Sequence, residues 1–332
     1  MLEEQKNRTD ESPANSRLVL SGMRHISKSV DRSIDNVLLA RSGARRVFPT
    51  SWPRLNRNLM GGLQPGKMYV IAGRPGVGKS AFSNQLIFDV LDRNQHKNVV
   101  VLYWSFEMPG EQQILRAGSK HTKLETADLL SVERKLSDDD FEKYVYSVEQ
   151  YKKYPVYFCS VPQDVNYIER TVRDVRDLTD KTTVINIIDH SRLVPSTEDI
   201  ELQRLNRLSK TCMYMQAQYQ CITILLSQLN RNIEQEFRAK NQYQPLLTDL
   251  FGGDSIGQDA HVVMMLQRPY DLYGITEPYC GEDPRGLMAV HVEKNRDGLL
   301  GMIPFETDLS TFTINERTDS PQEGDQSCTQ VT

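Results

Sequence analysis

The stretch MYVIAGRPGVGKSAF, residues 68–82, decides the fold of this 332-residue chain. Within it, GRPGVGKS fits the pattern G-x-x-x-x-G-K-[ST] at every position. An apolar run precedes the glycine-rich turn and an amphipathic segment follows it, so the turn joins a predicted strand to a predicted helix. Gly76 and Gly78 let backbone N–H groups turn inward and form an anion nest at the helix N-terminus. The stretch therefore predicts a phosphate-binding loop.

The residues of this loop are the candidate ATP-binding residues: Gly73, Arg74, Pro75, Gly76, Val77, Gly78, Lys79 and Ser80. Lys79 is expected to reach the β- and γ-phosphates, and the Ser80 hydroxyl is expected to ligate Mg²⁺. The alternative is a glycine-rich turn that matches by chance, and the flanking strand and helix weigh against it. ATP and Mg²⁺ are the predicted cofactors.

Outward from the loop, short apolar runs alternate with amphipathic segments. Runs that are apolar on both faces indicate strands covered by helices on both sides. This alternation predicts an α/β fold with a mostly parallel central sheet flanked by helices. The predicted strands are 68–73, 98–107, 156–160, 183–189, 221–228, 261–267 and 287–294, and predicted helices include 81–94, 166–179 and 202–218.

Polar side chains stand where three predicted strands end, and ligands of open α/β sheets bind at such ends. Asp189 is a candidate Mg²⁺ carboxylate, or else an N-cap of the next segment. Glu107, on what we expect to be the strand adjacent to the phosphate-loop strand, is a candidate general base, or else a solvated residue. Gln228 can bond a γ-phosphate and report its loss, although polar strand ends are common.

Composition excludes several function classes. The 40 basic and 44 acidic residues give a net charge of −4, which excludes a bulk polycation but not a local basic channel. No apolar run approaches the roughly 18–20 residues of a membrane span, and the polar N-terminus does not read as a secretory signal. The five cysteines form no CxxC pair, so neither a disulfide framework nor a zinc site is expected, and a reducing cytoplasm fits.

The predicted domain organisation follows these patterns. Residues 1–16 and 316–332 are polar and are predicted to be disordered. In the 17–46 region, apolar residues at three- and four-residue steps predict a helix from 17 to 43. This helix either packs on its own domain or is an arm that docks on a neighbouring subunit, and periodicity leaves both open. The α/β domain is predicted to span 47–315.

Several segments occur in the order seen in bacterial and phage replicative helicases of the DnaB type, and the sequence resembles that family over about residues 47–310. These segments are GGLQPGKMYVIAGRPGVGKS, SFEMPGEQQILR, NIID, SQLNR, SIGQDAHVVMMLQR and EKNRDGLLG. The resemblance implies a RecA-like P-loop fold, a hexameric ring, and ATP-driven 5′–3′ movement on single-stranded DNA that unwinds duplex DNA. The 17–46 region resembles the family's linker helix. Because few residues precede this region, we expect no counterpart of the family's N-terminal domain.

The resemblance also implies roles for the strand-end residues. Glu107 looks like the catalytic glutamate, and Arg116 like an arginine that approaches the phosphates. Asp189 looks like the Walker B aspartate, and Gln228 like the sensor glutamine. His190 departs from the tyrosine common in the family, and we expect it to be a local structural residue.

In EKNRDG, Lys294 and Arg296 are similar to the lysine and arginine finger that reach the γ-phosphate held by a neighbouring subunit. Such a finger supplies positive charge only in the assembled ring, so it would link hydrolysis to oligomerisation. The alternative is an exposed, charged strand end.

The family's DNA-contacting loop, commonly Arg-Glu-Ser-Gly-Ser, corresponds here to Phe251, Gly252, Gly253, Asp254 and Ser255. The arginine is absent from this sequence. The glycine N–H groups can still meet phosphates, and Phe251 can stack on a base. The alternative is a buried Phe251 beside an Asp254 that repels DNA.

The implied partners are single-stranded and forked duplex DNA, further copies of the chain in a homo-hexamer, and a helicase loader or primase, in a bacterial or phage-infected cell. A different class stays open: a non-unwinding RecA- or KaiC-like ATPase that acts as a recombination mediator or regulatory ring, or a loader that uses the fold as a docking platform. The loop at 251–255 together with EKNR favours the helicase, since a non-translocating ATPase needs neither.

Overall fold

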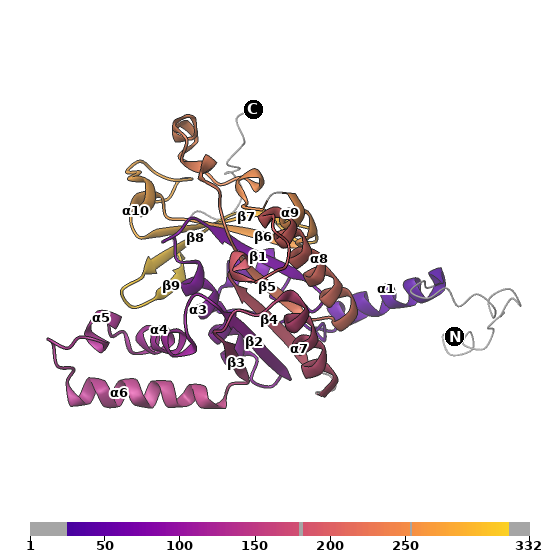
Figure 1. Cartoon of the computed structure of the whole chain (residues 1–332), viewed down its shortest axis with the longest axis horizontal. Coiled ribbons are helices and arrows are strands. Elements are labelled where there is room, and N and C mark those ends of the chain that lie inside the picture. Colours follow the sequence, from indigo (N-terminus) through magenta and orange to yellow (C-terminus); the bar gives the residue numbers. More distant parts are fainter. Residues whose placement is uncertain (1–24, 179–181, 253, 319–332) are drawn as a thin grey trace, which may run out of the picture. The chain divides into compact units, whose positions relative to one another are not determined.

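The computed structural model describes residues 25–178, 182–252 and 254–318 (Figure 1). The chain divides between Arg46 and Val47 into two compact units. In the first unit, α1 (Ile26–Arg41) has no buried residue. The predicted disordered segment 1–16, the first part of the predicted 17–43 helix and nearly all of 316–332 lie outside the described residues. The predicted domain boundaries stay predictions.

The second unit is built on one nine-stranded sheet in the order β3-β2-β4-β5-β1-β6-β7-β8-β9. The strands from β3 to β6 in this order pair in parallel, and β7, β8 and β9 add an antiparallel edge. The mostly parallel α/β fold is therefore confirmed. The strands are β1 (Met68–Gly73), β2 (Val99–Ser105), β3 (Val156–Cys159), β4 (Thr183–Asp189), β5 (Ile222–Gln228), β6 (Val262–Gln267), β7 (Leu287–Asn295), β8 (Gly301–Asp308) and β9 (Thr313–Glu316).

Helices cover both faces of this sheet, and alternate strand residues supply the two cores. Tyr69 and Ile71 of β1 face the core that includes α3, whereas Val70 and Ala72 face the core that includes α7 and α8. Both sets are buried, which is why the strands read as continuous apolar runs. The helices of this unit are α2 (Pro53–Asn58), α3 (Lys79–Arg93), α4 (Gly110–Thr122), α5 (Thr126–Leu129), α6 (Asp138–Glu149), α7 (Val165–Leu178), α8 (Glu201–Tyr219), α9 (Asp254–Asp259) and α10 (Pro269–Tyr273).

The strand order corrects one prediction. The strand before Glu107 is not adjacent to the phosphate-loop strand: β4 and β5 lie between β2 and β1. The neighbour of β1 on that side is β5, with Gly73 opposite Gln228. Crossover connections decide this order, and the local apolar pattern of a strand carries no information about which strand lies beside it.

The antiparallel hairpin β8–β9 was also absent from the predicted strands. The run GMIPFETD of β8 contains Pro304, which lacks a backbone N–H group and argues against an interior strand. The four-residue β9 is too short to give a clear alternation of apolar and polar residues.

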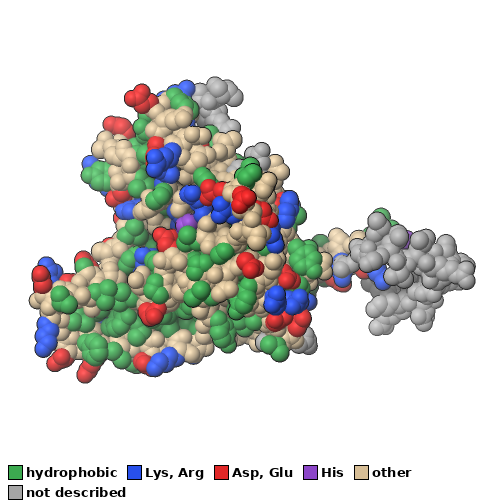
Figure 2. All heavy atoms as spheres, viewed as in Figure 1, with side chains coloured by type: hydrophobic (Ala, Val, Ile, Leu, Met, Phe, Trp, Pro, Cys, Tyr) green, Lys and Arg blue, Asp and Glu red, His purple; other side chains and the backbone are tan. Residues whose placement is uncertain are grey.

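An exposed apolar patch on α6 includes Phe141, Val145 and Tyr146, and we call these residues the α6 patch. Figure 2 shows apolar side chains gathered over this part of the molecule, at the lower left of the view. Contiguous exposed apolar surface of this kind often marks a contact with another protein.

In the described part of the chain, no helix is both long enough and apolar enough to cross a lipid bilayer.

Candidate functional site

The phosphate-binding loop has the backbone that its glycines allow. Gly76 and Gly78 have φ of 79° and 101°, in the left-handed region, and Gly78 caps the N-terminus of α3. The Lys79 ammonium donates hydrogen bonds to the carbonyls of Gly73, at 2.9 Å, and Arg74, at 3.2 Å. Burial lowers the pKa of Lys79 to about 8, and the nearby Asp189 and Glu107 carboxylates partly oppose this shift. The lysine is thus held at the mouth of an anion nest.

Asp189 is the last residue of β4, and its carboxylate accepts a hydrogen bond from the Ser80 hydroxyl. Its Oδ2 atom is buried and has no hydrogen-bond partner. Burial raises the pKa of Asp189 to about 6, although the Ser80 hydrogen bond opposes this shift. A buried carboxylate oxygen without a partner is costly unless it meets a cation.

These two residues fit a magnesium ion. The described residues contain no cluster of three or more His, Cys, Asp or Glu side chains that could hold a metal by themselves. Mg²⁺ typically keeps several waters and takes one or two protein oxygens together with substrate phosphates. The Ser80 hydroxyl and the Asp189 carboxylate offer donors of that kind.

His190 lies between two of the predicted strand-end residues. Its Nε2 atom is 3.8 Å from Oε2 of Glu107 and 3.4 Å from Nε2 of Gln228. Burial lowers the pKa of His190, so the ring is neutral near pH 7, and its Nδ1 accepts a hydrogen bond from the Arg192 N–H. We assign the proton to Nε2 for this reason, so the ring can donate toward the Glu107 carboxylate. From the sequence, we expected only a local structural role for His190.

Arg192 joins Gln228 to the predicted DNA loop. Its Nη1 donates to Oε1 of Gln228 at 3.3 Å, and its guanidinium lies 4.3 Å from the centre of the Phe251 ring. The Phe251 N–H donates to the carbonyl of Gln228 at 2.8 Å. Glu107, His190, Gln228, Arg192 and Phe251 thus form a continuous chain of contacts. Arg192 was not among the predicted site residues, although DHSR in place of the family's usual residues was a visible signal.

The predicted DNA loop is described in part. Gly252 has a φ of 92°, and a Cβ there would come within 2.5 Å of Leu205 Cδ1, so glycine is required for the backbone to lie against α8. Gly253 lies outside the described residues, and Asp254 begins α9. Phe251 is half-buried against the core on the α8 side, and the Ser255 hydroxyl is buried without a hydrogen-bond partner. The Phe251 side chain is therefore partly exposed, and it packs against the core and under the Arg192 guanidinium.

Arg116, on α4, lies near the two carboxylates of the site. Its guanidinium stacks on Phe312 at 4.6 Å from the ring centre. Burial lowers the pKa of Arg116, while the Asp189 and Glu107 charges oppose that shift. The structure thus brings Arg116 into the electrostatic environment of the nucleotide site.

Lys294 and Arg296 lie at the other end of the sheet. The Lys294 ammonium donates to the carbonyls of Gly257 and Gln258, each at 2.7 Å, and Arg296 Nη2 donates to that of Gln258 at 2.7 Å. Asn295 pairs with Val262 at the start of β6, and Val262 lies opposite Tyr69, near the start of β1. Along β1, the distance from Tyr69 to Gly73, where the phosphate loop begins, is about 13 Å. The structure does not bring these cations to Lys79 of the same copy.

The segment between Gln228 and Phe251 is held by a buried ion pair. Arg238 contacts both carboxylate oxygens of Asp249, at 3.0 and 2.9 Å, and the side chains are 9% and 3% exposed. Asp249 also accepts from the Leu246 N–H at 2.8 Å. The ion pair therefore fixes the segment that connects the two predicted functional residues.

Arg238→Ala is expected to lower the free energy of unfolding by about 3–5 kcal/mol, because it leaves the Asp249 carboxylate buried without its cation. Urea denaturation followed by circular dichroism measures this change. The matched control is Arg134→Ala, which removes a pair with Asp128 whose arginine is 82% exposed. We expect less than about 1 kcal/mol for the control, and equal losses in both variants would contradict the role given to Arg238.

A mostly parallel sheet, a phosphate-binding loop after β1 and an acidic end of β4 define a RecA-like P-loop ATPase fold. The model of the DnaB-like helicase C-terminal domain matches residues 48–314, so the chain belongs to this family.

Curated relatives and solved structures agree with this assignment. The chain is 27% identical over 300 residues to the replicative DNA helicase DnaB of Buchnera aphidicola subsp. Schizaphis graminum, with 85% of this chain and 59% of that protein covered. It is 24% identical over 305 residues to the replicative DNA helicase DnaC of Bacillus subtilis, with 90% and 63% covered. The chain thus spans less than two thirds of the length of these relatives.

The structural matches support the fold. A solved ATPase domain superposes with a TM-score of 0.77 at 21% identity, covering 88% of this chain and 99% of that one. A DnaB-like replicative helicase, solved in a study of its interactions with primase, gives a TM-score of 0.74 at 20% identity and covers 88% and 67%.

Proposed function

We propose that this chain is the motor of a replicative DNA helicase: a homo-hexameric, ATP-hydrolysing enzyme that moves 5′ to 3′ on single-stranded DNA and unwinds duplex DNA. The observation that carries the proposal is the division of its candidate site between the two ends of the sheet. Lys79, Ser80 and Asp189 lie at one end, and Lys294 and Arg296 lie at the other. A second copy that presents its far end to the phosphate loop would complete the site.

In the proposed reaction, Lys79 binds the β- and γ-phosphates, and the N–H groups of the loop cradle the triphosphate. Ser80 and Asp189 would hold Mg²⁺, which neutralises developing charge on the phosphates. Glu107 accepts the proton of the attacking water as general base. Its carboxylate is 58% exposed, so solvent water can reach it.

The γ-phosphate would also need positive charge from outside the copy that binds it. Arg296 and Lys294 of a neighbouring subunit supply that charge in the proposal, and Arg116 supplies a further cation from the same copy. The two trans residues are tethered only to backbone carbonyls in the described contacts, so a stronger anionic partner can draw them away.

Coupling to DNA would follow the contact chain that begins at Glu107. When Gln228 turns its amide to the γ-phosphate, it leaves Arg192, and the backbone bond from Phe251 transmits the shift to the loop at 251–255. Loss of the phosphate after hydrolysis reverses the shift. Repeated around a ring of copies, this cycle would give directional stepping with backbone-dominated DNA contacts and little sequence preference.

Two apolar surfaces support assembly into a ring. In α1, Val30, Ile34 and Val37 are exposed at helical spacing, and the α6 patch is exposed on the second unit. We propose that α1 docks on a second copy, as the linker helix of this family is expected to do. A helicase loader or a primase is a further candidate partner, by analogy with the relative that was solved with its primase interactions.

Single-stranded DNA is expected to stimulate ATP hydrolysis at least about tenfold, because the contact chain links the nucleotide site to the DNA loop. A forked duplex should be opened when it carries a 5′ single-stranded tail and not when it carries only a 3′ tail. Both are measured with the same preparation, by phosphate release and by strand displacement. ATP hydrolysis that single-stranded DNA does not stimulate, together with no strand displacement on either fork, would instead favour a non-unwinding RecA- or KaiC-like ATPase.

A further inference from the structure

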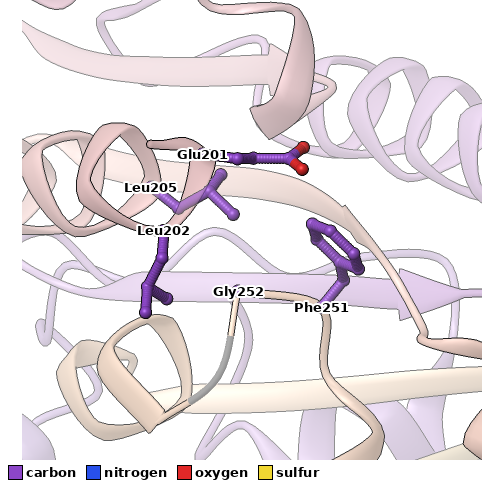
Figure 3. Close-up of a pocket in the computed structure, with 5 residues that line it drawn as sticks. All are labelled: Glu201, Leu202, Leu205, Phe251 and Gly252. Atoms are coloured by element: carbon purple, nitrogen blue, oxygen red, sulfur yellow. The ribbon is translucent and has the colours of Figure 1, made fainter. Parts of the chain in front are cut away.

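A pocket of about 270 Å³ lies beside Phe251. Its walls come from the start of α8, with Glu201, Leu202 and Leu205, and from the loop that contains Phe251 and Gly252. In Figure 3 the Phe251 ring and the Leu205 side chain point into the same space from opposite sides, below the Glu201 carboxylate. The pocket is smaller than the sites that hold drug-sized ligands, and its size suits a single ring system.

The walls of this pocket combine three kinds of chemistry. Leu205 is buried and Leu202 is about half exposed, so they form an apolar floor and an apolar rim. Phe251 adds an aromatic wall, and the Arg192 guanidinium lies over its ring at 4.3 Å and holds it in place. Glu201 adds a carboxylate at the rim, one oxygen of which pairs with Nε of Arg192 at 2.6 Å. Its second oxygen has no hydrogen bond described to another residue and remains an acceptor.

We propose that this pocket receives one base of single-stranded DNA, while Arg192 meets the adjacent backbone phosphate. A nucleobase is flat and aromatic, so it can stack against Phe251 and cover the two leucines. The exocyclic amino groups of adenine, cytosine and guanine, and the N3–H of thymine, are donors that suit the Glu201 carboxylate. The cation, the acceptor and the aromatic wall thus match the three parts of a nucleotide.

The location of the pocket favours DNA over other occupants. Gly252 belongs both to the pocket and to the predicted DNA loop, and Phe251 is bonded through its backbone to Gln228. The arginine expected in that loop is absent, and Arg192 restores a positive charge beside the ring from the end of β4. A cation on Phe251 attracts a phosphate chain, whereas a purely apolar partner would cover the Arg192–Glu201 ion pair without bonding to it.

This inference rests on the proposed function, since it names how the proposed DNA loop holds its substrate. It differs from backbone-only binding in one measurable respect: affinity should depend on the presence of bases. A strand of abasic sites offers the same phosphates and cannot fill the pocket.

The test compares two end-labelled oligonucleotides of equal length, oligo(dT) and a fully abasic strand, by fluorescence anisotropy with the complete chain and a non-hydrolysable ATP analogue. The wild type should bind oligo(dT) about tenfold more tightly than the abasic strand. Leu202→Trp, at an exposed position, fills the pocket with a large side chain and should bring the ratio of the two affinities close to one. Phe251→Ala should lower the same ratio by removing the stacking wall.

Met213→Trp is the matched control, because Met213 is a partly exposed residue of α8 that does not line the pocket. It should leave the ratio unchanged. Equal binding of both strands by the wild type, or a full preference for oligo(dT) in Leu202→Trp, would overturn the base pocket while leaving DNA binding intact. A wild type that binds neither strand would overturn the proposed function itself, and the base pocket with it.

Discussion

Lys79→Ala should abolish ATP hydrolysis, with a fall in rate of at least about a hundredfold. Lys79 is held by the carbonyls of Gly73 and Arg74 at the mouth of the loop, where we expect its ammonium to meet the β- and γ-phosphates. Its removal takes away the cation that the loop itself supplies to the developing phosphate charge. Phosphate release at saturating ATP measures the effect.

Lys152→Ala is the matched control for this change. Lys152 is an exposed lysine, 74% accessible, that pairs with Glu149 on the surface. The control should hydrolyse ATP at the wild-type rate and unfold at the wild-type temperature. A folded Lys79→Ala protein with full activity would refute the role of the phosphate-binding loop.

Arg296→Ala should bind ATP and fail to hydrolyse it, with a fall of about 10³ or more in the turnover rate. The reason is that the arginine lies at the opposite end of the sheet from the phosphate loop of its own copy. It can act only on a nucleotide held by a neighbour. A fluorescent ATP analogue should therefore bind the variant with near wild-type affinity while phosphate release is lost.

Mixing this variant with Glu107→Ala subunits tests the trans arrangement directly. Each variant alone lacks one half of every interface, but in a random mixed ring about a quarter of the interfaces combine an intact Glu107 with an intact Arg296. Mixing should thus restore measurable hydrolysis from two inactive preparations. The absence of any rescue, in rings shown to exchange subunits, would count against an arginine finger supplied by a neighbour.

Local features of the chain were predicted well. The seven predicted strands correspond to β1–β7 within about two residues, and the predicted helices at 81–94, 166–179 and 202–218 correspond to α3, α7 and α8. These elements are long enough, or apolar enough on both faces, to show their type without any partner. The hairpin β8–β9 was missed because its short strands and Pro304 weaken that local pattern.

The contacts between strand ends could be identified only from the folded structure. Asp189 and Gln228 were identified as strand-end residues, and DHSR was a visible departure from the family pattern. The sequence alone did not indicate that Arg192 would donate to the Gln228 amide oxygen or that His190 would lie beside the amide nitrogen. Those contacts depend on β4 and β5 being neighbours, which follows from the crossover connections. The order of strands also placed Glu107 farther from the phosphate-loop strand than predicted.

By itself the sequence determined the phosphate-binding loop, the α/β class and the acidic and amide residues at the ends of strands, since each depends on residues close together in the chain. Only the tertiary structure decided which strand ends meet, that Arg192 lies over Phe251, and that Lys294 and Arg296 lie at the far end of the sheet. These relations join residues tens to hundreds of positions apart. They are set by how the sheet is threaded and packed, and no local pattern of side chains encodes that path.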